Sequence, residues 1–156
     1  MRLSRNLSLS EVIKSNTATR LGISNLPTKT HLRNLKQTAE KVFQPIRDHF
    51  GTAIYVSSGY RSKALNEAIN GSKTSDHPRG RALDLDQDNR NTTVSNRDIF
   101  DYALANLDFD QLIFEYGTDS KPDWVHISYR GKEENRHQVL RVQRIEGKSV
   151  YTNYVK

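Results

Sequence analysis

The sequence predicts an α+β fold, in which helices pack on one face of a mainly antiparallel sheet. Helical periodicity dominates the first third of the chain, and short apolar runs bounded by turn residues follow it. Helices followed by antiparallel strands are typical of this class. The 156 residues suit one compact domain over 1–156, with a helical part, 1–52, and a sheet-bearing part, 53–156.

Four segments carry helix signals. A capping box, Ser8-x-x-Glu11, starts a short helix. Over 31–50, apolar residues recur every three or four positions; Gly51 can end this helix, and Pro45 should bend or break it near its last turn. Two further helices are each expected to start after a serine N-cap, over 63–69 after Ser62 and over 96–106 after Ser95.

Short apolar runs predict the strands, and Gly- or Pro-containing turns separate them. The expected strands cover 53–57, 82–85, 111–114 and 124–127. The segment 71–81 contains Gly, Ser, Pro and charged residues, which predicts a loop. Residues 138–154 alternate around Glu146-Gly147, which indicates a final hairpin.

Composition excludes several classes of protein. The chain has no cysteine, which excludes disulfide scaffolds, thiolate zinc fingers and cysteine nucleophiles. No apolar run approaches the roughly 20 residues that span a bilayer, so no membrane partner is expected. The net charge is +6, but the basic residues are scattered and accompany no nucleic-acid-binding motif. We therefore expect a solvated basic surface that favours anionic polymers, and no nucleic-acid partner.

Two of the five histidines have neighbours that suit a metal site. His77 lies in the loop before Gly80, whose freedom lets the chain fold back toward Asp84. His126 lies within a predicted strand. Two imidazoles and one carboxylate make a three-ligand zinc site with a fourth position open for water. On these residues alone, ordinary hydrogen-bonding histidines remain the alternative.

Calcium is a second metal that the sequence suggests as a candidate. Asp84-x-Asp86-x-Asp88 resembles the start of an EF-hand loop. The glycine expected next is Asn89, however, and Ser95 stands where the closing glutamate belongs. Calcium is therefore disfavoured.

The order of the motifs resembles a known family. Ser75-x-His77-x-x-Gly80-x-Ala82-x-Asp84, followed by Trp124-Val125-His126, is similar to the zinc D-Ala-D-Ala carboxypeptidase family, in particular its type-A subgroup of bacteria and phages. That family is related to lysostaphin-type peptidases and to the hedgehog domain. Further matching stretches cover 9–11, 58–62 and 109–115, so the resemblance extends over nearly the whole chain.

The resemblance implies a metal centre and a general base. His77, Asp84 and His126 would hold one zinc ion. Asp123, three residues before the last histidine, would take a proton from zinc-bound water and pass it to the leaving amine. Residues three apart in an extended strand face opposite sides, so the turn at Pro122 must swing Asp123 back toward the metal.

Other residues receive roles from the same resemblance. Arg61 would stabilise the negative charge that develops on the attacked carbonyl, and Ser75 would hydrogen-bond the substrate. Glu115 belongs to a matching stretch without a defined role, and a buried ion pair is an equal alternative. We expect Trp124 to pack in the core rather than to contact substrate.

The resemblance implies a zinc peptidase that cleaves peptidoglycan stem peptides, either as a D-Ala-D-Ala carboxypeptidase or as an L-Ala-D-Glu-type endopeptidase. The alternative is a non-catalytic zinc-containing wall-binding or phage structural module. We expect a monomer. The N-terminus lacks the apolar stretch of a secretory signal, so the protein is expected to stay in the cytoplasm until release, or to reach the wall after lysis or by assisted export.

Overall fold

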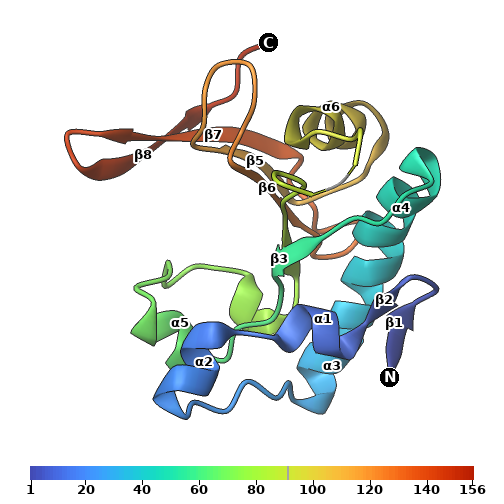
Figure 1. The fold of residues 1–156 in the computed structure, drawn as a ribbon, viewed down its shortest axis with the longest axis vertical. Coiled ribbons are helices and arrows are strands. Elements are labelled where there is room, and N and C mark those ends of the chain that lie inside the picture. The colour runs from blue at the N-terminus through green and yellow to red at the C-terminus, as the bar shows by residue number, and fades with distance from the viewer. Residues whose placement is uncertain (91) are drawn as a thin grey trace.

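The computed structural model describes residues 1–90 and 92–156, and a six-stranded sheet forms its centre (Figure 1). The strand order is β3-β4-β6-β5-β7-β8. All neighbouring strands are antiparallel except β5 and β7. The strands are β3 (Val56–Ser58), β4 (Ala82–Leu85), β5 (Gln111–Glu115), β6 (Trp124–Ser128), β7 (Gln138–Ile145) and β8 (Lys148–Asn153).

Helical segments and one small ribbon complete the fold. They are the ribbon of β1 (Arg2–Ser4) and β2 (Leu7–Ser8), the helices α1 (Leu9–Ile13), α2 (Asn16–Leu21), α3 (Lys29–Thr38), α4 (Gln44–Phe50), α5 (Lys63–Ala68) and α6 (Asn96–Asn106), the π-helical segment η1 (Ala39–Phe43) and the 3-10 turn η2 (His77–Arg79). No helix among residues 1–90 and 92–156 combines the length and the apolar character that crossing a bilayer requires.

The alternation of side chains divides the sheet into an apolar and a polar face. On β4, Leu83 and Leu85 belong to the hydrophobic core, whereas Asp84, which lies between them, lines a cleft. The core face packs against the helical stretch α3–η1–α4 and against α6, which contribute residues such as Phe43 and Phe100. The predicted α+β class, with helices over one face of a mainly antiparallel sheet, is confirmed.

The helix predicted over 31–50 is present, but its irregular turn lies earlier in the chain than predicted. The helical segment runs without interruption from Lys29 to Phe50, and Gly51 ends it with a φ of 64°. Its irregular part is η1, which lies just before Pro45 rather than at the last turn. Proline cannot donate to the carbonyl four residues earlier and clashes with it, and a π-helical turn relieves that clash by widening the helix.

The first strand is displaced along the chain from the predicted range 53–57. Gln87 takes the place of a neighbouring strand here: its side chain accepts from the Tyr55 amide (2.8 Å) and donates to the Ala53 carbonyl (3.1 Å). Regular pairing therefore starts only at Val56, opposite Leu85. A local apolar pattern cannot reveal that a distant side chain will occupy these backbone groups.

The C-terminal hairpin is confirmed, but its place in the sheet departs from a simple antiparallel meander. Glu146 and Gly147 have φ values of 51° and 77°, as a two-residue turn of this kind requires. After β6, the chain passes over the end of β5 and places β7 on the other side of it, parallel to β5. The hairpin β7–β8 thus forms one edge of the sheet (Figure 1).

A buried ion network ties the connection between β6 and β7 to the start of β5. The side chain of Asp110 is fully buried. Arg136 donates to both of its carboxylate oxygens, at 3.0 and 2.8 Å, and Arg130 lies 3.2 Å away. Burial alone would raise the pKa of Asp110, but the hydrogen bonds and charges of the two arginines outweigh burial and lower it.

We expect Asp110→Asn to lower the free energy of unfolding at pH 7 by about 2 kcal/mol, because the amide loses the charge-assisted hydrogen bonds that the buried carboxylate accepts from Arg136. Urea unfolding measures this effect. Asp101→Asn, at an exposed ion pair with Arg97, is the matched control and should cost well under about 1 kcal/mol.

At acid pH, the free energies of unfolding of the wild type and Asp110→Asn should differ less than at pH 7. The folded-state pKa of Asp110 is lowered, so its stabilisation is present above the unfolded value of 3.8 and is lost as the pH falls below it. A destabilisation by Asp110→Asn that is as large at pH 3 as at pH 7 would contradict this account.

Candidate metal centre and cleft

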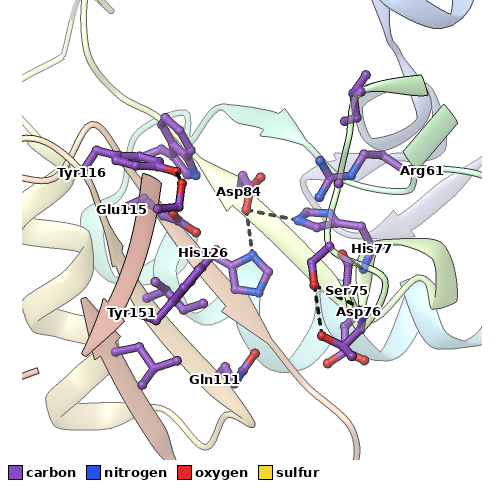
Figure 2. A pocket seen from close by; sticks show the side chains of 18 of the residues that line it. Arg61, Ser75, Asp76, His77, Asp84, Gln111, Glu115, Tyr116, His126 and Tyr151 are labelled. Atoms are coloured by element: carbon purple, nitrogen blue, oxygen red, sulfur yellow. Dashed lines mark hydrogen bonds and ion pairs between the residues drawn. The ribbon is translucent and has the colours of Figure 1, made fainter. Parts of the chain in front are cut away.

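Two of the predicted ligands lie on neighbouring strands of the polar face. In the antiparallel pairing of β4 with β6, Asp84 lies directly opposite His126. Residues opposite each other on one face of a sheet have their side chains in contact. The His126 Nδ1 and Asp84 Oδ1 atoms are accordingly 2.9 Å apart, at the floor of the cleft (Figure 2).

The third predicted ligand comes from the loop before β4. His77 begins η2, and its Nε2 lies 3.2 Å from Asp84 Oδ1. Its Nδ1 lies against the Gly59 carbonyl, so Nδ1 carries the proton and Nε2 presents a lone pair to the site. Gly80 ends η2 with a φ of 73°, and a Cβ there would lie 2.5 Å from the His31 carbonyl oxygen. Only glycine allows this loop to return toward β4.

The three side chains form a compact, buried donor set. One ligand atom from each of His77, Asp84 and His126 lies within 4.8 Å of the others. All three residues are at least nine-tenths buried. Burial opposes ionisation of Asp84, but the charges and hydrogen bonds of the two imidazoles hold its pKa below the usual range. Two imidazole nitrogens and an ionised carboxylate oxygen suit zinc, so these residues fit a bound divalent ion.

The aspartates that suggested calcium do not gather around one point. Asp86 Oδ1 accepts from the Asn96 side chain (3.0 Å), and Asp88 pairs with Lys121 at 3.2 Å. Asp84 faces the imidazoles instead. Within the described residues, His77, Asp84 and His126 are the group of side chains able to hold a metal.

Arg61 lies beside the donor set, as Figure 2 shows. Its backbone amide donates to the His77 carbonyl at 3.4 Å, which fixes it next to the first ligand. Its side chain lines the cleft, and its buried Nε has no hydrogen-bond partner among the described residues. Burial lowers the pKa of Arg61, but an arginine stays charged in practice. The guanidinium can therefore donate to an oxygen that develops negative charge in the cleft.

Glu115 is a second carboxylate on the polar face. It lies at the end of β5, two residues after Ile113, the partner of His126 in the β5–β6 pairing. Its side chain lines the cleft and takes part in no salt bridge within the described residues, so the ion pair considered above is not formed. Burial raises the pKa of Glu115 to about 7.

The structure does not bring Asp123 to the cleft. Asp123 is exposed and is absent from the residues that line the cavity. Its backbone amide donates to the backbone carbonyl of Glu115 (2.9 Å), and its own carbonyl accepts from the Asn96 side chain (2.8 Å). These two bonds hold Asp123 just before β6. Strand β6 begins only at Trp124, so Asp123 belongs to the turn after Pro122, and that turn leaves it exposed outside the cleft.

Ser75 and Trp124 both line the cleft. The Ser75 hydroxyl accepts from the His77 amide at 3.1 Å, so it stabilises the ligand loop while its own proton remains free for another acceptor. Trp124 was expected in the core, and this expectation is wrong: it shares the polar face with His126, and its ring lies 5.3 Å from that of Tyr116. The alternation of β6 alone predicts this placement, because Trp124 and His126 are two residues apart.

The cleft has a volume of about 750 Å³ and is open to solvent. One wall comes from the loop before η2, and the floor comes from β4, β5 and β6. The opposite wall comes from the hairpin β7–β8, and no motif in the sequence indicates this role. It contributes Leu140, Arg144, Ser149 and Tyr151. A wall built by the pairing of distant strands leaves no local motif by which it could have been found.

Comparisons with known proteins bear on this site. A sequence model of the family described as Peptidase M15 matches residues 5–128, which is most of the chain. The matched range includes the three candidate ligands, Arg61 and Glu115, and it ends before β7. A search of the curated proteins finds no match to the chain.

Proposed function

Because this chain belongs to the Peptidase M15 family, we propose that it is a zinc-dependent peptidase that hydrolyses a peptide bond in peptidoglycan stem peptides. The observation that carries the proposal is the convergence of His77 Nε2, Asp84 Oδ1 and His126 Nδ1 at the floor of an open cleft. A hydrolase of this kind needs a site that holds its metal and admits a peptide at the same place.

His77, Asp84 and His126 would hold one zinc ion. Bound there, the ion would supply Lewis-acid polarisation of the attacked carbonyl and would lower the pKa of water. The Gly59 carbonyl orients His77 through its Nδ1 proton, and the direct opposition of Asp84 and His126 across two strands fixes the other two donors. Little side-chain reorganisation is therefore needed when the site is filled.

Arg61 would donate hydrogen bonds to the oxyanion formed as water adds to the carbonyl. Its otherwise unsatisfied Nε favours this role, because an acceptor that arrives in the transition state removes the cost of a buried, unpaired donor. Ser75, whose hydroxyl proton remains available at the cleft wall, would hydrogen-bond the substrate backbone.

For proton transfer we propose Glu115 rather than Asp123. Glu115 shares the cleft with the ligands and is not engaged by a cation, whereas Asp123 is exposed outside it. The Glu115 carboxylate would accept the proton of the attacking water and return it to the leaving amine. Asp123, the base that the resemblance implies, is the competing candidate.

The test uses the full chain with defined muropeptides and mass spectrometry. The zinc-loaded protein should release fragments cut at one peptide bond; a chelator should stop the release, and added zinc should restore it. The new termini distinguish a D-Ala-D-Ala carboxypeptidase from an L-Ala-D-Glu-type endopeptidase. Cleavage that persists after complete metal removal would overturn the proposal, and zinc binding without cleavage would favour the non-catalytic wall-binding or structural module instead.

A further inference from the structure

The hairpin β7–β8 is an addition to the part of the chain that the family model matches. That match ends at residue 128, and β7 begins at Gln138. The hairpin nevertheless takes part in the cleft, because the parallel pairing of β7 with β5 continues the polar face beyond Glu115. A cleft wall outside the matched range is a natural place for specificity that this chain does not share with the whole family.

Arg144 is the charged residue of this wall. It lies on β7 opposite Ser149 of β8, and its guanidinium carbon lies 5.5 Å from the centroid of the Tyr116 ring. The Tyr116 hydroxyl forms a 2.7 Å hydrogen bond with Ser149, and its ring adjoins Trp124. The ring beneath the guanidinium is thus held from two sides, which limits the positions that the cation occupies.

No carboxylate of the described residues lies within salt-bridge distance of Arg144. The other arginine of the same strand differs in this respect. Arg141, whose guanidinium lies over Phe114 on the other face of the sheet, pairs with Asp119 at 2.7 Å. The strand therefore carries one neutralised arginine away from the cleft and one uncompensated arginine within it. Arg144 Nη1 donates to the Gly147 carbonyl at 3.5 Å, and its other N–H groups can bind a carboxylate in two parallel hydrogen bonds.

The position of Arg144 along the sheet sets the expected spacing. Ile113 of β5 pairs with His126 of β6 on one side and with Leu140 of β7 on the other, so the three form one row across the sheet. Arg144 lies on β7 four residues beyond that row. With strands about 4.8 Å apart and a rise of about 3.4 Å per residue, the Cα atoms of His126 and Arg144 are about 17 Å apart. An extended peptide attacked beside His126 would reach the guanidinium within about three to five residues, given the length of the arginine side chain.

We infer that Arg144 binds a carboxylate group of the peptide substrate, and that the hairpin β7–β8 thereby selects anionic peptides. This inference rests on the proposed peptidase function. It assigns a specificity determinant at a distance from the cleaved bond, in addition to Arg61 at the metal centre. Tyr151, which is half-exposed on the same wall, would cover the aliphatic part of the bound peptide.

A set of matched peptides tests the inference. Each peptide carries the same scissile bond and one carboxylate, placed two to five residues away; its partner carries a carboxamide at that place. For one placement, the wild type should favour the carboxylate peptide by about tenfold in kcat/KM, which corresponds to about 1.4 kcal/mol. Arg144→Gln should cleave the two partners at equal rates, and Arg144→Lys should recover part of the preference, because lysine restores the charge but not the paired donors.

Arg90→Gln is the matched control. Arg90 also lies over a tyrosine ring, at 4.5 Å from the centroid of Tyr55, but it does not line the cleft, so its removal should leave the preference intact. Equal cleavage of every pair by the wild type, or a preference that survives in Arg144→Gln, would overturn the inference while the peptidase proposal stands. If the wild type cleaves no peptide, the peptidase proposal fails, and calorimetric binding of the same pairs to wild type and Arg144→Gln decides the inference by itself.

Discussion

Replacing His126 by alanine is expected to lower kcat/KM by roughly a thousandfold or more, because the metal would lose one of three ligands and with it the activation of water and carbonyl. His126 is buried, and it contributes the donor atom nearest to Asp84. Zinc content, measured by elemental analysis after dialysis, should fall in parallel. Initial rates on the muropeptide identified above give the kinetic effect.

His137→Ala is the control for this experiment. His137 is exposed and pairs with Asp108 at 2.7 Å, away from the cleft, so its removal should change neither the zinc content nor the rate. Thermal unfolding of each variant shows whether a loss of activity comes from misfolding. Wild-type protein stripped of metal shows how far the rate falls when the metal is lost without any substitution. A His126→Ala protein that is folded and cleaves at the wild-type rate would show that the metal centre is not the catalytic one.

Glu115→Gln is expected to lower kcat by about 10²- to 10⁴-fold while the zinc content remains that of the wild type, since a glutamine of equal size cannot accept the proton of water. A residue that only supports the ligands would affect zinc affinity instead, so the two measurements separate a role in proton transfer from a structural role. Steady-state kinetics with zinc in excess measure kcat, and competition with a chromogenic chelator measures the zinc affinity.

Asp123→Asn provides the comparison that distinguishes the two candidate bases. Because Asp123 is exposed outside the cleft, its replacement should change kcat by no more than about twofold, as for an ordinary surface substitution. If Asp123→Asn loses activity and Glu115→Gln keeps it, the base is the one that the resemblance implies, and the chain before β6 must rearrange when substrate or metal binds.

Much of the local structure could be predicted because its causes lie within a few residues. The capping boxes at Ser8 and Ser95 each close on a carboxylate three residues later and begin α1 and α6 where expected. Gly147 makes the hairpin turn possible. The helix α2 was not predicted although it carries similar signals, an N-cap at Ser15 and a left-handed Gly22, because its few residues show no strong apolar period.

The two candidate bases show what spacing along the chain leaves open. Spacing relative to His126 selects Asp123, which is exposed and does not line the cleft. Glu115 reaches the same face as His126 from a different strand. Its proximity depends on the register of β5 against β6, and register is set by the packing of the whole sheet.

Residue types and their local spacing identify the groups available for the chemistry: two histidines and an aspartate with zinc-binding character, a nearby arginine, and the glycine that lets the ligand loop turn back. The folded chain alone shows that Glu115 shares the cleft with them and that the C-terminal hairpin forms its far wall with Arg144. The difference comes from the range of the interactions. Caps and turns depend on neighbouring residues, whereas strand register and the parallel placement of β7 depend on contacts between segments far apart in the chain.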